Sequence, residues 1–545
     1  MARVTRVNGP LIEVHGLDGA AMFELVDAGG VPGEVVALTG DHATVQAYEY
    51  TGGLRPGARV ASLGAPLSAR LGPHLLGGIF DGLLRPLDGT GMWLEPSALR
   101  TSEERSWPFR PLVRVDTTVA PGTPIGMVDA TADGAGALPY LVLSPGGTIT
   151  AIRPEGGYAA NTPVASVGGR DITMQWLWPV RRALPYRDRL DDQVPLITGQ
   201  RVIDLLLPVR RGGTVAVPGG FGTGKTVLLQ QIAKWCDADV VVYIGCGERG
   251  NEMADVLAEL RELADPRTGG RLLDRTVVIA NTSNMPMMAR EASVYTGVTV
   301  AEHFRDMGYD AVVIADSTSR WAEARREFAS RGGALSAEEG YPADLASAIA
   351  AFYERAGPVT TLGGKPGSVT IIGAVSPPGG DLTEPVTTHT QRFVRAVWSL
   401  DRDLAYSRHY PAVSWSGSFS RDGAALAACH ARNDGRDWVT SRTRVASLLA
   451  EADRLSALAE LVGTATFPAR ERVVLLAGRL LREGLLQQSA LSPSDAYCAP
   501  ERTARLARLI LDAVDDCLRL TERGTPAGEI EVRDFSDLLR AKERP

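Results

Sequence analysis

The chain has 545 residues, 44% of them hydrophobic and 22% charged, and a formal net charge of −7. A chain of this length is too long to fold around a single hydrophobic core, which predicts three or four domains. The mildly acidic balance, with arginines and acidic residues interspersed, argues against a nucleic-acid partner or a polybasic membrane surface. No apolar run is long enough to cross a bilayer and the N-terminus has no signal-peptide pattern, so we expect a cytoplasmic protein that is free to dock on a membrane complex.

The sequence of the first part of the chain is typical of β structure. Residues 1–85 alternate apolar and polar positions in short runs separated by glycine turns, which predicts a small antiparallel β-barrel. Residues 110–182 contain two similar stretches, 113–126 and 147–158, which look like the two halves of a flattened β-sandwich of the biotinyl-carrier kind. A carrier needs a lysine at its hairpin tip and this region has none, so we predict a structural module.

The remainder of the chain changes pattern twice. Residues 183–425 repeat strand, loop and helix, which predicts a parallel sheet covered on both faces, and we assign residues 86–109 to the same α/β domain. Residues 426–545 carry leucines and alanines at three- and four-residue spacing, which predicts a helical domain.

A complete phosphate-binding loop lies inside the α/β region. It follows a short apolar strand and precedes a helical pattern, which is the context that this motif requires. Its glycines let backbone N–H groups converge on phosphate oxygens, and the helix N-terminus adds partial positive charge. Lys225 is then expected to bridge the outer phosphates of a nucleotide, and the Thr226 hydroxyl to bind Mg²⁺. The predicted nucleotide-binding residues are Gly219, Gly220, Phe221, Gly222, Thr223, Gly224, Lys225 and Thr226.

Carboxylates follow two further buried strands. Glu248 and Arg249 come after the apolar run 239–245, and Asp316 ends the run 311–315. Ligands of an open parallel sheet collect at the C-terminal ends of its strands. A carboxylate at the position of Glu248 can polarise a water against the γ-phosphate, and one at Asp316 can hold Mg²⁺ through its water shell.

Several long motifs carry a family resemblance. The residues concerned are 6–10, 218–226, 243–252, 281–286, 316–323 and 377–385. In this order they closely resemble the catalytic A (alpha) subunit of the vacuolar/archaeal-type rotary ATPases, and the likeness covers nearly the whole chain, including the 110–182 insertion peculiar to that subunit. The resemblance implies a multidomain fold: an N-terminal β-barrel, a β-sandwich insertion, a central RecA-like α/β P-loop domain and a C-terminal α-helical domain.

The resemblance also implies an activity and partners. It describes a catalytic subunit that alternates with a non-catalytic B subunit in a hetero-hexamer on the inner face of the cell membrane. Hydrolysis or synthesis of ATP from ADP and phosphate is coupled there to H⁺ or Na⁺ transport, through central and peripheral stalk subunits and a membrane sector. A neighbouring subunit would supply the arginine finger.

Site roles follow residue by residue from the same resemblance. Lys225 and Thr226 match the phosphate and Mg²⁺ positions, Glu248 the water-activating glutamate, Arg249 its phosphate-side neighbour and Asp316 the Mg²⁺-side aspartate. The adenine would contact Tyr410, Leu491 and Tyr497. The family usually has proline at Gly220, serine at Thr223 and an aromatic residue at Leu491, so weaker adenine stacking is expected here.

Two other functions fit a phosphate loop. A RecA-like hexameric motor for protein export or nucleic acid would lack the 110–182 insertion, and an RNA translocase would need a basic central loop that the sequence does not show. A non-catalytic nucleotide-binding subunit of the same ring would have a broken phosphate loop or a replaced Glu248, and both are intact.

Overall fold

The computed structural model describes residues 1–87, 105–129, 138–331, 336–432 and 437–544. They form two compact units that are described separately below. Unit 1 contains Met1–Asp191, Ala238–Val375 and Thr383–Phe393; unit 2 contains Asp192–Asp237, Ser376–Leu382 and Val394–Pro545. Residues 88–104, most of the 86–109 segment assigned to the α/β domain, lie outside the described residues.

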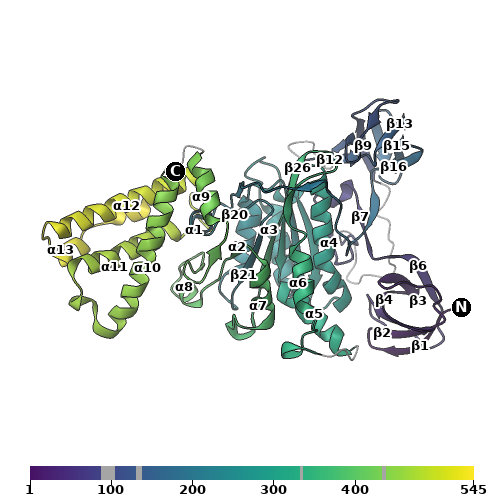
Figure 1. Ribbon diagram of the computed structural model, residues 1–545, viewed down its shortest axis with the longest axis horizontal. Helices are drawn as coiled ribbons and strands as arrows, with labels where there is room; N and C mark the ends of the chain where they lie inside the picture. The colour runs from purple at the N-terminus through teal and green to yellow at the C-terminus, as the bar shows by residue number, and fades with distance from the viewer. Residues whose placement is uncertain (88–104, 130–137, 332–335, 433–436, 545) are drawn as a thin grey trace. The chain divides into compact units, whose positions relative to one another are not determined.

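The N-terminal part of unit 1 is a six-stranded antiparallel sheet in the order β1-β2-β5-β4-β3-β6 (Figure 1). The alternating sequence pattern explains it, because every second side chain, such as Ile12, Val14 and Val45, is buried in one apolar core. The strands are β1 (Arg3–Asn8), β2 (Leu11–His15), β3 (Glu24–Ala28), β4 (Val31–Thr39), β5 (His42–Ala47) and β6 (Val60–Pro66). Strand β8 (Ile79–Phe80), within the range 1–85 expected for the barrel, instead pairs with β23 of the α/β sheet.

The insertion consists of two four-stranded sheets, in the orders β10-β13-β15-β16 and β12-β11-β9-β14. Its strands are β9 (Ser106–Pro111), β10 (Thr118–Val119), β11 (Pro124–Asp129), β12 (Pro139–Leu143), β13 (Gly147–Ile152), β14 (Gly156–Ala159), β15 (Pro163–Val167) and β16 (Arg170–Thr173). Beyond them, β17 (Trp176–Pro179) pairs with β7 (Ser68–Leu71).

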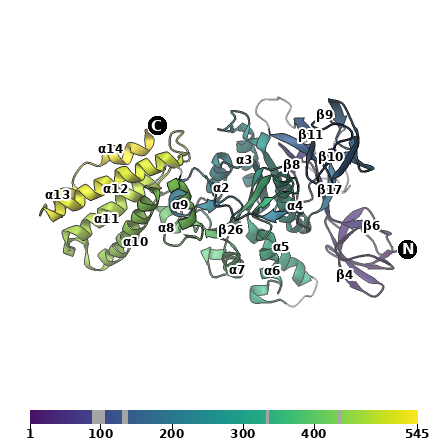
Figure 2. The ribbon, with the colours of Figure 1, turned by 45° about the horizontal axis from the view of Figure 1, so that its top comes forward.

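The α/β part of unit 1 is built on parallel strands in the order β8-β23-β22-β24-β26. The bounds are β22 (Val240–Glu248), β23 (Thr276–Thr282), β24 (Asp310–Asp316) and β26 (Pro366–Val375). These strands are almost entirely buried, as expected for a parallel sheet covered on both faces. The helices around them are α3 (Gly250–Glu262), α4 (Met287–Asp306), α5 (Thr318–Arg331), α6 (Leu345–Tyr353) and α7 (Pro385–Phe393), visible in Figures 1 and 2.

Unit 2 combines the phosphate loop with the helical C-terminal region. Strand β21 (Thr214–Pro218) pairs in parallel with β27 (Ala396–Val397), and helix α2 (Lys225–Trp235) follows the loop. The long helices are α10 (Trp438–Val462), α11 (Ala469–Leu481) and α12 (Pro500–Glu522), and a π-helical turn, η6 (Arg482–Leu486), extends α11. The predicted fold, a barrel, a β-rich insertion, an α/β part and a helical C-terminal region, is thereby confirmed.

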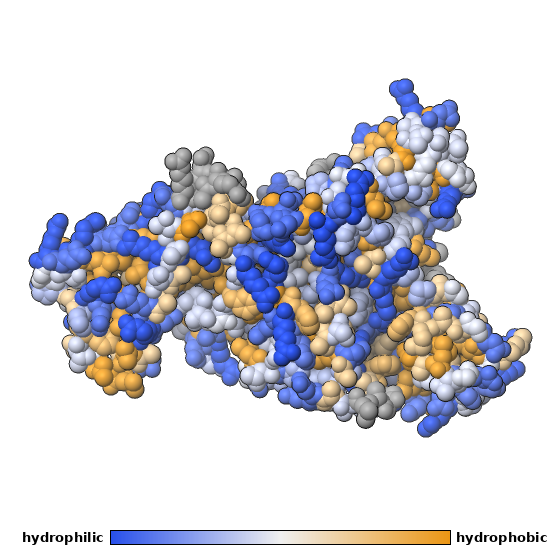
Figure 3. Space-filling model, in the orientation of Figure 1, coloured by the Kyte–Doolittle hydropathy of each residue, from blue (hydrophilic) through white to orange (hydrophobic). Residues whose placement is uncertain are grey.

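Apolar side chains are exposed at the end of α10. Leu458, Leu461 and Val462 are 41%, 82% and 57% exposed, and hydrophobic surface gathers there in Figure 3. Exposed apolar residues that form a large contiguous patch are typical of contact surfaces. Among the described residues, no helix has the length and apolar character to span a membrane.

Candidate functional site

The phosphate loop of unit 2 has the backbone that its glycines allow. Gly222 and Gly224 have φ angles of +80° and +82°, a region that residues with a Cβ atom rarely adopt. Gly219 is required for a different reason, because a Cβ there would lie 2.8 Å from the Cβ of Leu400. The Thr223 hydroxyl donates a hydrogen bond of 2.8 Å to the carbonyl of Gly220, which closes the loop on itself. The loop is therefore held in a fixed shape by local contacts.

Lys225 is the first residue of α2, and its ammonium group lies over the loop. Its Nζ donates to the carbonyl of Gly219 at 2.9 Å and to the hydroxyl of Ser376 at 2.6 Å. A lysine held at a helix N-terminus is a suitable partner for phosphate oxygens. Ser376 had no predicted role; its place directly after a buried strand, before Pro-Pro-Gly-Gly, is the signal that points to it.

The predicted carboxylates lie in unit 1, at the C-terminal ends of two neighbouring parallel strands. Glu248 is the last residue of β22 and Asp316 the last of β24, and Gly245 pairs with Asp316. Asp316 is 2% exposed and accepts a hydrogen bond of 3.4 Å from the Tyr243 hydroxyl. The register of the sheet thus brings the two acidic groups to the same edge of the sheet.

The electrostatic environment of Glu248 is unusual. Its pKa is raised to about 8, first by burial, then by the negative charge of Asp316 and by a hydrogen bond with Glu252. The positive charge of Arg320 acts in the opposite direction. A carboxyl group whose pKa is near neutrality is suited to general acid–base chemistry.

Two arginines lie near Glu248, one next to it in the sequence and one close enough to affect its pKa. Arg249 is exposed at the N-terminus of α3. Arg320 donates a hydrogen bond of 2.8 Å to Glu323. The Cβ atom of Arg320 lies 2.8 Å from the position that a Cβ atom would occupy at residue 247, so Arg320 can approach this closely because residue 247 is glycine. Arg320 lies within the motif 316–323 but had no predicted role in the site.

The residues predicted to hold Mg²⁺ have suitable chemistry. Thr226 offers a hydroxyl and Asp316 a buried carboxylate, which are the hard oxygen donors that this ion prefers. Among the described residues, no group of three or more His, Cys, Asp or Glu side chains could hold a metal.

The three predicted adenine residues lie in unit 2 in different surroundings. The Cε1 atom of Tyr410 lies 3.2 Å from the position that a Cβ atom would occupy at Gly224, so this ring borders the phosphate loop. Tyr497 is half-buried and stacks on Trp235 of α2, with ring centroids 5.3 Å apart. Leu491 is 95% exposed. Trp235 was not predicted, and only its place at the end of the phosphate-loop helix would have suggested it.

Four family models match the chain in order. They are the ATP synthase alpha/beta family β-barrel domain (residues 4–64), the barrel-sandwich domain of the alpha/beta subunits (98–181), the alpha/beta family nucleotide-binding domain (199–420) and the C-terminal domain of V and A type ATP synthase (428–522).

Similar proteins align over nearly their full length. The A subunit of the A-type ATP synthase of Desulfurococcus sp. is 46% identical over 548 residues, covering 97% of this chain and 93% of the relative. The V-type ATP synthase alpha chain of Nitrosococcus oceani is 47% identical over 551 residues, covering 97% and 92%. Among solved structures, the ATPase EscN of the enteropathogenic E. coli type III secretion system has a TM-score of 0.69 at 21% identity, covering 94% of this chain and 100% of that one. This last similarity concerns the fold.

Proposed function

The chain belongs to the family formed by the A subunits of A-type ATP synthases and the alpha chains of V-type ATP synthases, and we propose from this premise that it is the catalytic subunit of a rotary ATPase. It couples hydrolysis or synthesis of ATP to transport of H⁺ or Na⁺ across a membrane. The observation that carries the proposal is the position of Lys225. Its ammonium group is held over an intact phosphate loop by hydrogen bonds to Gly219 and Ser376. The export-motor alternative does not explain the match of the V/A-type C-terminal model, and the non-catalytic alternative does not explain the intact phosphate loop and Glu248.

In the proposed mechanism, the chain's own residues position the phosphates and the attacking water. The loop glycines and Lys225 bind the outer phosphates, and Lys225 offsets their charge. The carboxylate of Glu248 orients the water and accepts its proton during hydrolysis, and returns a proton during synthesis. Arg249 is proposed to lie on the phosphate side of Glu248.

Mg²⁺ is the proposed cofactor. Thr226 would hold it through the hydroxyl group, and Asp316 through a water molecule. When bound, the ion neutralises charge on the phosphate oxygens. Tyr410, Leu491 and Tyr497 are proposed to contact the adenine.

The partners are those of an ATP synthase complex. We propose an alternating hetero-hexamer with a non-catalytic B subunit on the inner face of the membrane, joined to stalk subunits and an ion-translocating sector. The exposed apolar end of α10, at Leu458, Leu461 and Val462, supports a contact with such a partner. A neighbouring subunit supplies the transition-state arginine, so the isolated chain is expected to hydrolyse ATP roughly 10³ to 10⁵ times more slowly than the assembly.

The decisive experiment replaces Glu248 by Gln in the assembled complex. The amide keeps the size of the side chain but accepts no proton, so Mg-ATP binding should persist while turnover falls about a thousandfold or more. Glu259→Gln, at an exposed glutamate of the following helix α3, is the matched control and should keep normal turnover. If Glu248→Gln retains a third of the normal rate, Glu248 is not the catalytic carboxylate.

A further inference from the structure

The segment 487–498, which we call the adenine loop, contains Leu491 and Tyr497 and joins η6 to α12. The ends of this loop are held in place by Arg201, which is fully buried. The guanidinium donates to the carbonyls of Leu485 at 2.6 Å and Gln487 at 2.7 Å, and to the carboxylate of Asp495 at 2.6 Å. One buried side chain therefore holds both ends of the adenine loop.

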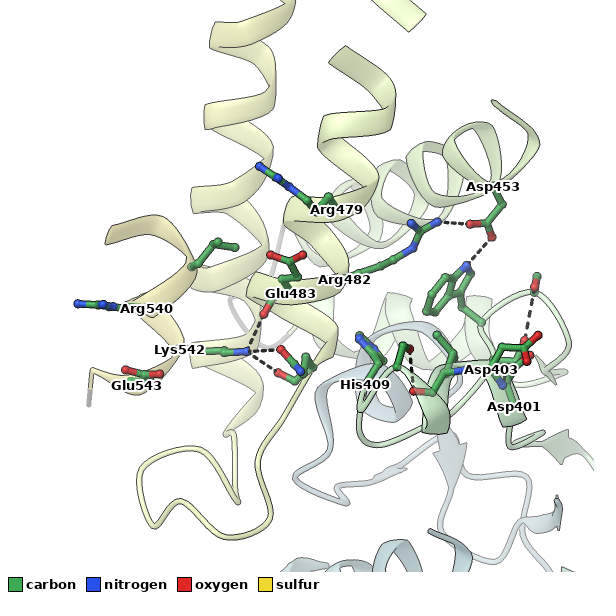
Figure 4. Close-up of a pocket in the computed structure, with 17 residues that line it drawn as sticks. Asp401, Asp403, His409, Asp453, Arg479, Arg482, Glu483, Arg540, Lys542 and Glu543 are labelled. Atoms are coloured by element: carbon green, nitrogen blue, oxygen red, sulfur yellow. Dashed lines mark hydrogen bonds and ion pairs between the residues drawn. The ribbon is translucent and has the colours of Figure 1, made fainter. Parts of the chain in front are cut away.

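A second set of contacts comes from the C-terminal tail, which we define as α14 (Ser536–Leu539) and η7 (Arg540–Glu543). The ammonium group of Lys542 donates to the carbonyl of Glu483 at 2.6 Å, the carbonyl of Gln487 at 3.3 Å and the Oε1 of Gln487 at 3.2 Å (Figure 4). These acceptors lie in the π-helical turn and at the start of the adenine loop. Lys542 therefore ties the tail to the first residue of that loop.

The far end of the adenine loop is tied to the same tail. Arg502 of α12 donates to the carbonyl of Ser494 at 2.7 Å and, through its other terminal nitrogen, to the carbonyls of Lys542 and Arg544. One arginine thus bridges the loop and the tail. Since each end of the loop is linked to the tail, a displaced tail would remove contacts at both ends of the loop and leave those made by Arg201.

Among the described residues, none in the tail is fully buried. The tail forms part of the wall of a cavity of about 930 Å³ that is lined mostly by charged and polar residues, including His409, Arg482 and Glu483 (Figure 4). One apolar contact of the tail comes from Leu539, whose Cδ2 lies 3.4 Å from the position that a Cβ atom would occupy at Gly484. Polar bonds to carbonyl groups therefore contribute much of the tail's attachment.

We propose that Lys542 is a positioning residue for nucleotide binding: by anchoring the C-terminal tail on Gln487 it holds the adenine loop, and Tyr497 within it, in the conformation that receives the base. This inference rests on the proposed function, because it assigns the adenine to that loop. Lys542 acts through the loop and not on the phosphates. Its loss should therefore weaken binding of adenine nucleotides and leave binding of a base-free polyphosphate unchanged.

The test is an equilibrium titration of the full chain with Mg-ATP, Mg-ADP and inorganic tripolyphosphate. Lys542→Ala should weaken ATP and ADP binding about three- to tenfold and change tripolyphosphate binding less than about twofold. Lys542→Arg, which can still donate to carbonyls, should restore most of the ATP affinity. Lys365→Ala is the matched control, because Lys365 is an exposed lysine of unit 1. Unchanged ATP affinity in Lys542→Ala, or an equal loss for ATP and tripolyphosphate, overturns the inference.

Lys225→Ala in the same titration separates this inference from the proposed function. If Lys225→Ala weakens both ligands while Lys542→Ala weakens neither, only the role of Lys542 is wrong. If Lys225→Ala weakens neither ligand, the phosphate-loop function itself is wrong. Should Lys542→Ala be unfolded at the titration temperature, Lys542→Met keeps the apolar stem of the side chain and is judged by the same outcomes.

Discussion

The ring of Tyr497 stacks on the indole of Trp235, with planes 27° apart and centroids separated by 5.3 Å. Trp235 is the last residue of α2, the helix that begins at Lys225. Its indole nitrogen donates to Gln231 at 3.1 Å, which fixes the ring on the helix. The phosphate-loop helix and the adenine loop are therefore connected directly through two aromatic side chains.

Replacing Trp235 by Ala should weaken Mg-ATP binding by a few-fold up to about tenfold. The stack contributes roughly 0.5–1.5 kcal/mol, and its loss leaves the Tyr497 ring without its support. Trp235→Phe keeps an aromatic surface and should stay within about threefold of the wild-type affinity. Nucleotide titration checks this, and equal affinities of the alanine and wild-type proteins would show that the stack is only structural.

Replacing Lys225 by Ala should weaken ATP binding as well as catalysis. The bound phosphates lose a charge-assisted partner worth about 1.5–3 kcal/mol, which corresponds to roughly a ten- to hundredfold higher Kd. Direct titration with Mg-ATP measures the loss, with Lys365→Ala as the control. An unchanged Kd would contradict the phosphate-loop assignment.

Replacing Leu491 by Phe tests the position where the family resemblance predicts an aromatic residue. Leu491 is 95% exposed, so a larger side chain meets no packed neighbours and should not lower the melting temperature. An aromatic contact with the base should tighten ATP and ADP binding by a few-fold up to about tenfold, and slower ADP release would lower turnover. Affinity and Tm are measured together; unchanged affinity with an unchanged Tm would remove Leu491 from the adenine site.

Replacing His303 by Phe should reduce the sensitivity of folding to acid. His303 is buried beside Tyr140 and Trp176, and neither ring nitrogen has a hydrogen-bond partner among the described residues. Burial, with a smaller contribution from the charge of His74, lowers its pKa to about 3. The unfolded chain, with a histidine pKa near 6.5, binds the proton first. Stability is therefore lost as the pH falls from about 6.5 towards 3, by about 2 kcal/mol at pH 5 from this group.

The check is the fall in Tm between about pH 8 and pH 5, which spans the ordinary histidine pKa. The fall should be smaller in His303→Phe than in the wild-type protein, even if the two differ in Tm at the higher pH. A second variant, His430→Phe, provides the comparison. His430 is a histidine of unit 2 whose pKa is also lowered by burial. An identical fall in wild type and His303→Phe would show that His303 is protonated equally in the folded and unfolded states.

Contiguous sequence was sufficient for the main features of the fold and of the phosphate loop. Strand alternation predicted the barrel, and the glycine spacing predicted the loop whose φ angles at Gly222 and Gly224 require glycine. Glu248 and Asp316 could be placed together because parallel strands end at a common sheet edge, a rule that needs no side-chain detail. The assignment of nucleotide contacts to these residues remains a prediction.

Contacts between distant segments could not be predicted in the same way. Arg201 reaches Asp495 across 294 residues, Tyr497 stacks on Trp235, and Lys542 binds the carbonyl of Gln487. No local periodicity encodes such pairs, because each depends on where separate elements pack and which buried donors then need acceptors. The packing of the elements therefore identifies the residues that hold the adenine loop, and local patterns identify the loop that is predicted to bind phosphate.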